Sequence, residues 1–374
     1  MRNTYLAVTA ALVIAAAVGL AQQAGPYKVL KSEKAGGTGG FDYIYADAAG
    51  RRLYIPRSAD NNATPPVPAR VSIFDLDTLA PVGEIPDTRA AGAAVDVESG
   101  HGFATSKPVA MWDTKTEKLI KTIDVQGGPD GILGDAYNHR IYILSHQAPH
   151  VTVIDAKSGD ILGTLDLGGA PEQAATDGAG HIYIDVSDKA NVAVIDSKAM
   201  TVTGHYPLGD NISGVAGLAI DAKNHILFAA CRGSSPTMVI LNANDGKIIT
   251  TLPLAGSTDG AVFNPATMEA FSSHGNGTMT IIKENSPTSF VVEQNLDTMM
   301  GAKTLTLDSK TNHVLTMAAE YAAPPAAAAA PATPPPAPAA GGPPQGQGRG
   351  GFGGGRGGRG AMLPGSFTIL VVGK

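Results

Sequence analysis

Residues 135–160 read DAYNHRIYILSHQAPHVTVIDAKSGD, and residues 177–200 repeat the same order as DGAGHIYIDVSDKANVAVIDSKAM. In both stretches an Asp opens a short turn, an apolar run with Ile and Tyr follows, and a second β-branched run ends at another Asp. β-Branched runs favour strands, and Asp side chains accept hydrogen bonds from the backbone N–H groups of turns. The sequence therefore predicts strands separated by Asp-led hairpin turns, with four short strands in each unit.

This unit recurs seven times along the chain. The residue that opens its first turn is Asp47, Asp96, Asp135, Asp177, Asp221, Asn264 and Asp308 in successive units. Four-stranded units of about 40 to 50 residues are typical of β-propeller blades. Two stacked sandwiches would need units of unequal role, whereas these units are alike. We therefore predict an all-β fold, a seven-bladed β-propeller with four antiparallel strands per blade.

The two ends of the repeat region predict how the ring closes. Residues 26–37 resemble a fourth strand, and the last unit ends at a third strand, residues 367–374. We expect the N-terminal strand to complete blade 7, which pairs two otherwise free sheet edges. The single domain then covers 26–374. Its blades are expected over 39–88, 89–128, 129–169, 170–209, 210–257, 258–300, and 301–374 with 26–38.

Residues 1–21 have the pattern of a secretory signal peptide. A basic start at Arg2 precedes an apolar run from Leu6 to Leu20, and Gly19 and Ala21 supply small residues at the −3 and −1 cleavage positions. The run is shorter than the roughly 20 residues that span a bilayer. We expect a soluble, periplasmic or secreted protein, not a lipoprotein, without a stable membrane anchor and monomeric. An uncleaved N-terminal anchor is the alternative.

A second biased segment covers 322–362. It holds 12 of the 46 Gly and 9 of the 26 Pro of the chain, and its only charged residues are Arg349, Arg356 and Arg359. Such a composition cannot bury enough surface to order itself, so we expect a disordered insertion in blade 7. Its place between the second and third strands of that blade puts it on the face where chains enter the inner strands. A passive linker or a polyanion contact is favoured over RNA binding.

Charge and composition exclude several classes of function. The chain has 33 acidic and 27 basic residues, a net charge of −6, so we expect no binding to duplex nucleic acid. The single Cys231 excludes a disulfide framework and the paired-Cys motifs of zinc sites and covalently attached haem. One Trp is too few for the docking motifs of a quinoprotein, and no sequence motif of a serine hydrolase, zincin or P-loop enzyme occurs. No cofactor is predicted except a possible Ca²⁺ ion.

The units resemble the YVTN-type, YncE-like propeller family of exported bacterial proteins. The resemblance rests on residues 140–146 and 181–187 at the "YVTN" position, and on 151–155 and 192–196 at the following V-x-V-I-D position. It is weaker in blade 2, where 109–113 reads VAMWD, and in blade 6. The resemblance implies a scaffold for a soluble ligand or a partner. Some members are reported to bind single-stranded DNA, which this acidic chain does little to support.

The mouth of the central channel carries the first group of candidate site residues. The position five residues before each turn residue is occupied, round the ring, by Asp42, Ala91, Asp130, Glu172, Ala216, Asp259 and Lys303. Converging carboxylates raise one another's pKa unless a cation relieves them. Asp42, Asp130, Glu172 and Asp259 are therefore candidate Ca²⁺ ligands. The alternative is that these side chains only hydrogen-bond strand ends and neighbouring blades.

A second group lies ten or eleven residues after each turn residue. It contributes Arg57, Lys107, His146, Arg232 and His274, with Arg89 nearby in sequence. The candidate ligand-binding residues are thus Asp42, Arg57, Arg89, Lys107, Asp130, His146, Glu172, Arg232, Asp259, His274 and Lys303. We predict an exported, non-catalytic scaffold that binds a small molecule, a cation or a protein through this face. The alternative is a lactonase-like or other propeller hydrolase, whose catalytic residues would be Asp130, Glu172, Asp259, His146 and His274.

Overall fold

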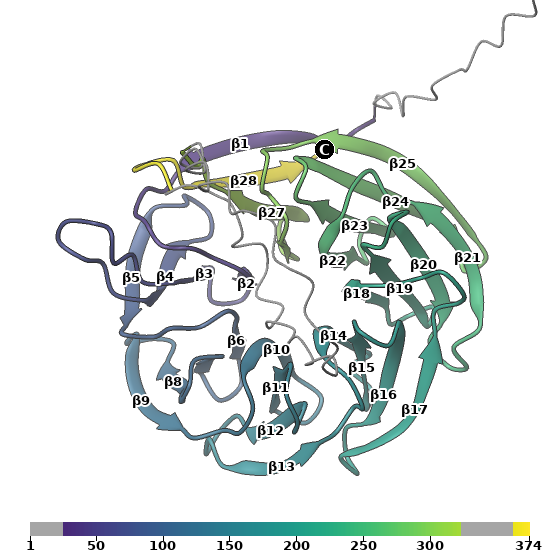
Figure 1. Ribbon diagram of the computed structural model, residues 1–374, viewed down its shortest axis with the longest axis horizontal. Coiled ribbons are helices and arrows are strands. Elements are labelled where there is room, and N and C mark those ends of the chain that lie inside the picture. The colour runs from purple at the N-terminus through teal and green to yellow at the C-terminus, as the bar shows by residue number, and fades with distance from the viewer. Residues whose placement is uncertain (1–24, 323–361) are drawn as a thin grey trace, which may run out of the picture.

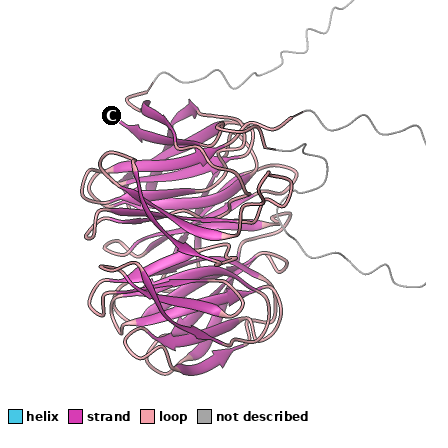
Figure 2. Cartoon of the chain, turned by 90° about the vertical axis from the view of Figure 1, so that its left-hand side faces the viewer, coloured by secondary structure: helices cyan, strands magenta, loops and turns pink. Residues whose placement is uncertain are grey.

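Seven four-stranded antiparallel sheets radiate from a central axis in the computed structural model, which describes residues 25–322 and 362–374 (Figure 1). The predicted seven-bladed all-β propeller is confirmed. The edge-on view shows strands stacked across the ring, with loops on both faces (Figure 2). No helix long and apolar enough to cross a membrane occurs in these two ranges. The signal peptide predicted for 1–21 and all but the ends of the insertion predicted for 322–362 lie outside the described residues.

In blades 1 to 6 the four strands follow the chain from the axis outward. Blade 1 holds β2 (Tyr45–Asp47), β3 (Arg52–Arg57), β4 (Arg70–Asp75) and β5 (Pro81–Pro86), and blade 2 holds β6 (Ala93–Asp96), β7 (His101–Ala104), β8 (Val109–Asp113) and β9 (Lys118–Ile123). Blade 3 holds β10 (Pro129–Asp135), β11 (Arg140–Ser145), β12 (Val151–Asp155) and β13 (Ile161–Leu165), and blade 4 holds β14 (Pro171–Thr176), β15 (His181–Val186), β16 (Asn191–Asp196) and β17 (Thr201–Pro207). Blade 5 holds β18 (Val215–Asp221), β19 (Ile226–Cys231), β20 (Thr237–Asn242) and β21 (Ile248–Pro253), and blade 6 holds β22 (Thr258–Asn264), β23 (Glu269–His274), β24 (Thr278–Ser286) and β25 (Ser289–Asp297).

Blade 7 joins the two ends of the chain, as predicted. Its strands are β26 (Leu305–Asp308), β27 (His313–Ala318), β28 (Thr368–Gly373) and, outermost, β1 (Lys28–Lys34). Lys28 pairs with Gly373 and Lys34 with Thr368, and β1 lies outside β28 in Figure 1. Gln294 of blade 6 fixes the start of β1: its side chain accepts a hydrogen bond from the Tyr27 backbone N–H (2.9 Å) and donates one to the Tyr27 carbonyl (2.8 Å).

The insertion leaves and re-enters the fold between β27 and β28, where the sequence placed it. Its described ends meet, because Tyr321 and Met362 form an isolated antiparallel bridge. The Leu363 backbone N–H also donates to the Glu320 carbonyl at 2.8 Å. The second and third strands of blade 7, β27 and β28, therefore pair directly, although residues 322–362 separate them in the sequence.

The core lies between neighbouring sheets. All six residues of β19 are buried, whereas the outer strand β17 alternates exposed and half-buried positions. In one interblade cluster Tyr142 and Leu144 of blade 3 pack against Ile182 and Ile184 of blade 4. β-Branched and aromatic side chains on both faces of the middle strands supply this burial, which is the main stabilising contribution. The stacked sheets hold the seven inner strands at fixed positions round the axis.

Turn aspartates make the local contacts expected of them. Asp47 Oδ1 accepts hydrogen bonds from the backbone N–H groups of Ala49 (3.1 Å) and Gly50 (2.9 Å). The same bonding to a residue two to four positions later occurs at Asp135, Asp177, Asp221, Asp308, Asp75, Asp113, Asp155, Asp196 and Asn242. These turns end the inner and third strands, so they all lie on the face opposite the channel mouth. The structural role predicted for these residues is confirmed.

Candidate functional site

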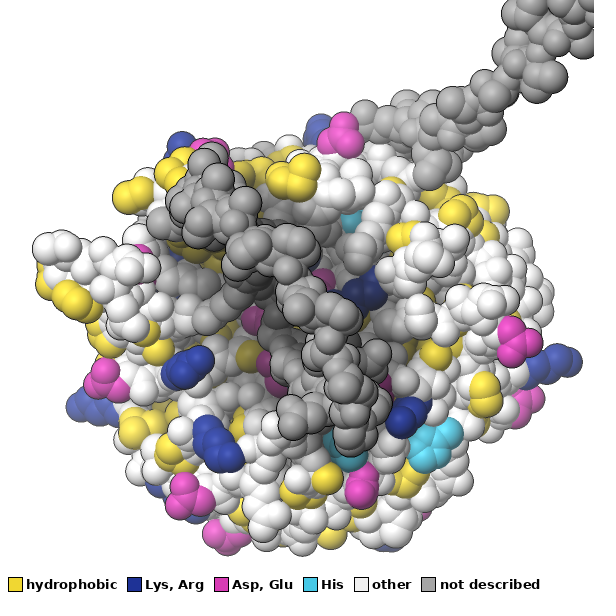
Figure 3. Space-filling model, viewed as in Figure 1, with side chains coloured by type: hydrophobic (Ala, Val, Ile, Leu, Met, Phe, Trp, Pro, Cys, Tyr) yellow, Lys and Arg dark blue, Asp and Glu magenta, His cyan; other side chains and the backbone are white. Residues whose placement is uncertain are grey.

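The candidate site is the channel mouth, where the chain enters the inner strands. Asp42 lies three residues before the start of β2, and Lys303 lies two residues before the start of β26. Asp130, Glu172 and Asp259 are the second residues of β10, β14 and β22. Each inner strand begins at the same end of the ring, so the fold brings these five side chains together from five blades. On the face drawn in Figure 3, acidic, basic and His side chains are interspersed.

Two basic side chains separate three of the four carboxylates. Lys303 Nζ lies 3.1 Å from Asp42 Oδ1 and forms a second ion pair with Asp259 Oδ2. Arg232, which follows β19 of blade 5, donates from Nη1 to Asp259 Oδ1 and from Nη2 to Glu172 Oε1, both at 2.7 Å. Five blades are linked by these contacts. Lys303 therefore compensates carboxylates at the mouth, as its sequence position allowed, and Arg232 provides a second compensating charge.

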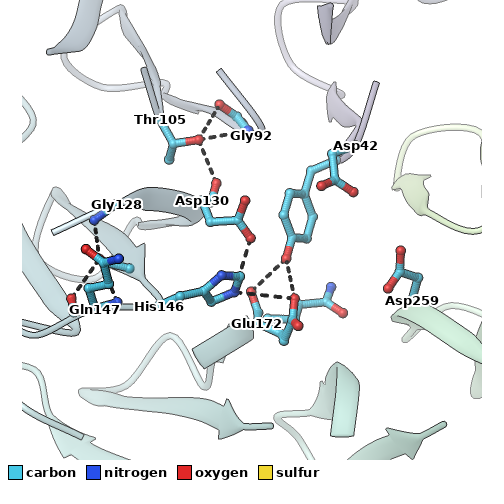
Figure 4. Close-up of polar contacts among 12 residues, drawn as sticks. Asp42, Gly92, Thr105, Gly128, Asp130, His146, Gln147, Glu172 and Asp259 are labelled. Atoms are coloured by element: carbon cyan, nitrogen blue, oxygen red, sulfur yellow. Dashed lines mark hydrogen bonds and ion pairs between the residues drawn. The ribbon is translucent and has the colours of Figure 1, made fainter. Parts of the chain in front are cut away.

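His146 continues the alternation on the other side of Glu172. Its Nε2 lies 3.8 Å from Glu172 Oε2 and 3.4 Å from Asp130 Oδ2, and Figure 4 shows the ring between these two side chains. The atom is shielded from solvent, and it has no hydrogen-bond partner within the described residues. The mouth thus holds an open series in the order Asp42, Lys303, Asp259, Arg232, Glu172, His146, Asp130, which we call the charge series.

Electrostatics differ along the charge series. Burial and then the nearby Asp42 charge raise the pKa of Asp130 to about 6, although His146 opposes the shift. The pKa of Asp42 is also raised by burial, against the effect of Lys303. Burial alone would raise the pKa of Glu172, but His146 and Arg232 bring it below its usual value. Contact with Glu172 in turn raises the pKa of His146. Asp130, at the end of the series, is the carboxylate with the weakest compensation.

The side chain, the backbone N–H and the backbone carbonyl of Glu172 each have a polar partner. Its side chain binds Arg232, its backbone N–H donates to Asp185 Oδ1 at 3.0 Å, and its carbonyl accepts from the Tyr43 hydroxyl at 3.0 Å. Asp185 is completely buried in β15, and burial raises its pKa to about 7. The sequence did not single out Asp185 or Tyr43. The available signal was Asp185 itself, an acidic residue inside the apolar run HIYIDV.

Gln173, the residue after Glu172, forms the contacts between neighbouring blades that the alternative interpretation expected at the mouth. Its Oε1 accepts from the backbone N–H groups of Leu218 and Ala261, and its Nε2 donates to the Ala261 carbonyl, all at 3.0 Å. A side chain from blade 4 thereby joins the inner strands of blades 5 and 6. These bonds fix the spacing of the strands that carry Glu172 and Asp259.

The structure does not bring the other predicted site residues into the charge series. Arg57 is buried, with its guanidinium 3.8 Å from the centre of the Phe367 ring, and burial lowers its pKa to about 9. Lys107 donates to the Gly127 carbonyl, and Arg89 is exposed. His274 is completely enclosed at the end of β23, where Nε2 lies 3.0 Å from Thr280 Oγ1. Burial lowers the pKa of His274 to about 4, so the ring is neutral.

The predicted residues that reach the mouth and those that are buried differ by one position along the second strand of the blade. His146 and Arg232 come directly after β11 and β19 and reach the mouth. Arg57 and His274 are the last residues of β3 and β23, so they are equivalent to Ser145 and Cys231, the final residues of β11 and β19. Neighbouring residues of a strand point to opposite faces, which directs Arg57 and His274 into the interblade core.

Comparison with known proteins gives the fold and no family. No family model matches the chain, and no curated protein matches it either. Among solved structures, a chain of "Crystal Structure of Mitotic Checkpoint Complex" has a TM-score of 0.66 and 10% sequence identity, over 84% of this chain and 95% of that one. Identity this low supports the propeller fold alone. Membership of the YVTN-type family stays a prediction from the repeats.

Proposed function

We propose that the protein is an exported, non-catalytic propeller scaffold that captures a positively charged ligand at its channel mouth. The YVTN-like repeats and the signal-like residues 1–21 support the exported, periplasmic or secreted setting. The ligand is a metal ion, a cationic small molecule, or a Lys or Arg side chain of a protein partner. Protein partners have one further support, since the structural neighbour belongs by its title to a multi-protein complex.

One observation carries this proposal: the charge series is open at Asp130. Four carboxylates alternate with three basic groups, so the series stays negative even when His146 is protonated. Asp130 has His146 on one side, while blade 2 contributes Ala91 at the equivalent mouth position. An added cation beside Asp130 would complete the alternation and relieve the cost of keeping a partly buried carboxylate ionised.

The positions of several predicted catalytic residues count against the hydrolase alternative. His274 is enclosed away from the mouth, and Glu172 and Asp259 are both bound to Arg232. Asp130 and His146 remain as an acid–base pair, but no Ser, Thr or Cys nucleophile is hydrogen-bonded to either side chain among the described residues. Turnover of lactones or esters that disappears in Asp130→Ala would replace the scaffold proposal with this alternative.

Calorimetric titration tests the proposal directly. Purified protein is titrated with Ca²⁺, Zn²⁺ and an organic diamine, and the same titrations are made on Asp130→Asn. We expect saturable binding of at least one cation, weakened about tenfold or more in Asp130→Asn because the variant removes the uncompensated charge. Asp245→Asn, an exposed turn residue on the opposite face, is the matched control and should bind as wild type does. If no cation of any of the three kinds binds wild-type protein, the proposed function is wrong.

A further inference from the structure

We infer that Asp130, His146 and Glu172 form a binding site for a divalent transition-metal ion, with His146 Nε2 as the nitrogen ligand. The inference rests on the proposed function and names the class of cation that the mouth takes. It differs from the four-carboxylate Ca²⁺ site predicted from sequence, since Asp42 and Asp259 are joined to Lys303.

The three ligand atoms already lie close to the spacing of a coordination shell. One atom from each residue falls within 4.8 Å of the other two. His146 Nε2 is 3.4 Å from Asp130 Oδ2 and 3.8 Å from Glu172 Oε2. Bonds of about 2.0 to 2.2 Å to a zinc-like ion place neighbouring ligand atoms roughly 3 to 4 Å apart. Small side-chain rotations therefore bring all three atoms onto one ion.

The environment of His146 Nε2 adds to this geometry. This atom is shielded from solvent, points between two carboxylates and lacks a hydrogen-bond partner in the described part of the chain. N–H···O hydrogen bonds are usually about 2.7 to 3.2 Å long, so a proton on Nε2 leaves both neighbours beyond good hydrogen-bond distance. A neutral lone pair at this atom would be repelled by both oxygens. An ion between the three residues uses the lone pair and both carboxylates at once (Figure 4).

The surroundings hold the ligands in place and leave room for exchangeable positions. Arg232 binds Glu172 Oε1 at 2.7 Å, which leaves Oε2 facing His146. The Thr105 hydroxyl donates to the Asp130 carbonyl at 2.6 Å. Such outer contacts orient metal ligands and raise affinity. The Asp130 and His146 side chains are 23% and 25% exposed, so water or a ligand group can occupy the remaining coordination positions.

The donor set selects the kind of metal. Imidazole nitrogen suits Zn²⁺, Co²⁺ and similar ions, whereas Ca²⁺ takes six to eight oxygen ligands. Two carboxylates with one imidazole fit a divalent transition metal that keeps one or more water molecules. The resulting ion has an open coordination position directed into the channel mouth, where an anionic or neutral donor group of a ligand or partner can bind.

The test is a titration of the full mature chain, freed of any affinity tag, with Zn²⁺ and Co²⁺. Calorimetry gives stoichiometry and affinity, and the visible absorption of bound Co²⁺ reports coordination by nitrogen and oxygen. We expect one ion per chain, with affinity reduced about a hundredfold or more in His146→Gln and in Asp130→Asn. His181→Gln is the matched control, because His181 also contacts one carboxylate, Asp177 at 2.8 Å, but on the opposite face. Circular dichroism and thermal unfolding check that every variant is folded.

The outcomes separate this inference from the proposed function. Loss of Zn²⁺ and Co²⁺ binding in His146→Gln with retention in His181→Gln supports the metal site. Zn²⁺ binding that is absent, or equal in wild type and His146→Gln, overturns it. If the diamine still binds and Asp130→Asn still weakens it, the mouth captures organic cations and the proposed function stands without the metal. If neither metal nor diamine binds, both proposals are wrong.

Discussion

The two ends of the inner strands use the same residue type in opposite ways. At the turn end, the Asp47 carboxylate binds backbone N–H groups two and three residues away. At the mouth end, the carboxylates of Asp42 and Asp259 are compensated by Lys303, which is remote in sequence from Asp42 and belongs to another blade. Hydrogen bonds to nearby backbone N–H groups fix the turn. Ion pairs with residues remote in sequence instead leave a balance of charge that an added ion can change.

The pKa values of several carboxyl groups show the same contrast, although His146 and Arg232 lower the pKa of Glu172 at the mouth. Backbone N–H groups, that of Ser158 first, lower the pKa of the turn residue Asp155. Burial raises the pKa of the mouth residues Asp42 and Asp130. Raised carboxyl pKa values near one another are typical of binding and catalytic sites, although structural ion pairs also produce them. The comparison locates the ligand-binding potential of the propeller at one end of its channel.

Removing Lys303 should have the largest effect on stability. Lys303→Met leaves Asp42 without a cation and Asp259 with Arg232 alone, so we expect a loss of about 3 kcal/mol in the free energy of unfolding, the range found for breaking a buried ion pair. Urea unfolding at pH 7 measures it. Lys310→Met, at an exposed turn position, is the control and should change little. A loss below about 1 kcal/mol would mean that solvent screens the mouth charges as it screens surface pairs.

The sequence predicted the parts of this molecule that depend on local pattern. Blade number, strand order, ring closure by residues 28–34 and the turn role of Asp47 all follow from periodicity and turn chemistry. It also placed Asp130 and Glu172 at the same mouth. The order and approximate position of the strands depend on local sequence, and the repeat shows the same local pattern seven times.

What the sequence did not predict depends on side-chain direction and on contacts between blades. His146 and His274 occupy nearly equivalent repeat positions, yet the one-residue offset sends His146 to the mouth and His274 into the core. The span of Arg232 across Glu172 and Asp259 requires blade 5 to stand between blades 4 and 6 at a fixed distance. Pattern analysis of one strand at a time contains no such distance.

Glu284 lies near the turn end of β24, but its pKa is raised, unlike that of the turn residue Asp155. It therefore tests the contrast between the two ends of the strands. Its buried carboxyl accepts from Asn224 Nδ2 at 2.8 Å, and burial, reinforced by Asp221, raises its pKa to about 7. Between about pH 4.5 and 7 the folded chain then binds more protons than the unfolded chain, so stability falls as pH rises through this window. We expect Glu284→Gln to remove a fall on the order of 2 kcal/mol. Urea unfolding at pH 5 and pH 7.5 measures the difference, and an unchanged pH dependence in the variant would show that Glu284 is compensated as the other turn carboxylates are.

Asp47→Ala should have the smallest effect of the three. The substitution frees the backbone N–H groups of Ala49 and Gly50, which lie in a solvent-facing turn where water can replace the carboxylate. Hydrogen bonds of this kind contribute about 1 kcal/mol, so the expected loss in unfolding free energy at pH 7 is about that size, well below that of Lys303→Met. Asp47→Asn, which keeps an acceptor oxygen, should recover most of it. A loss in Asp47→Ala as large as that in Lys303→Met would mean that the turn aspartates also have a long-range role, and the division between the two ends of the inner strands would fail.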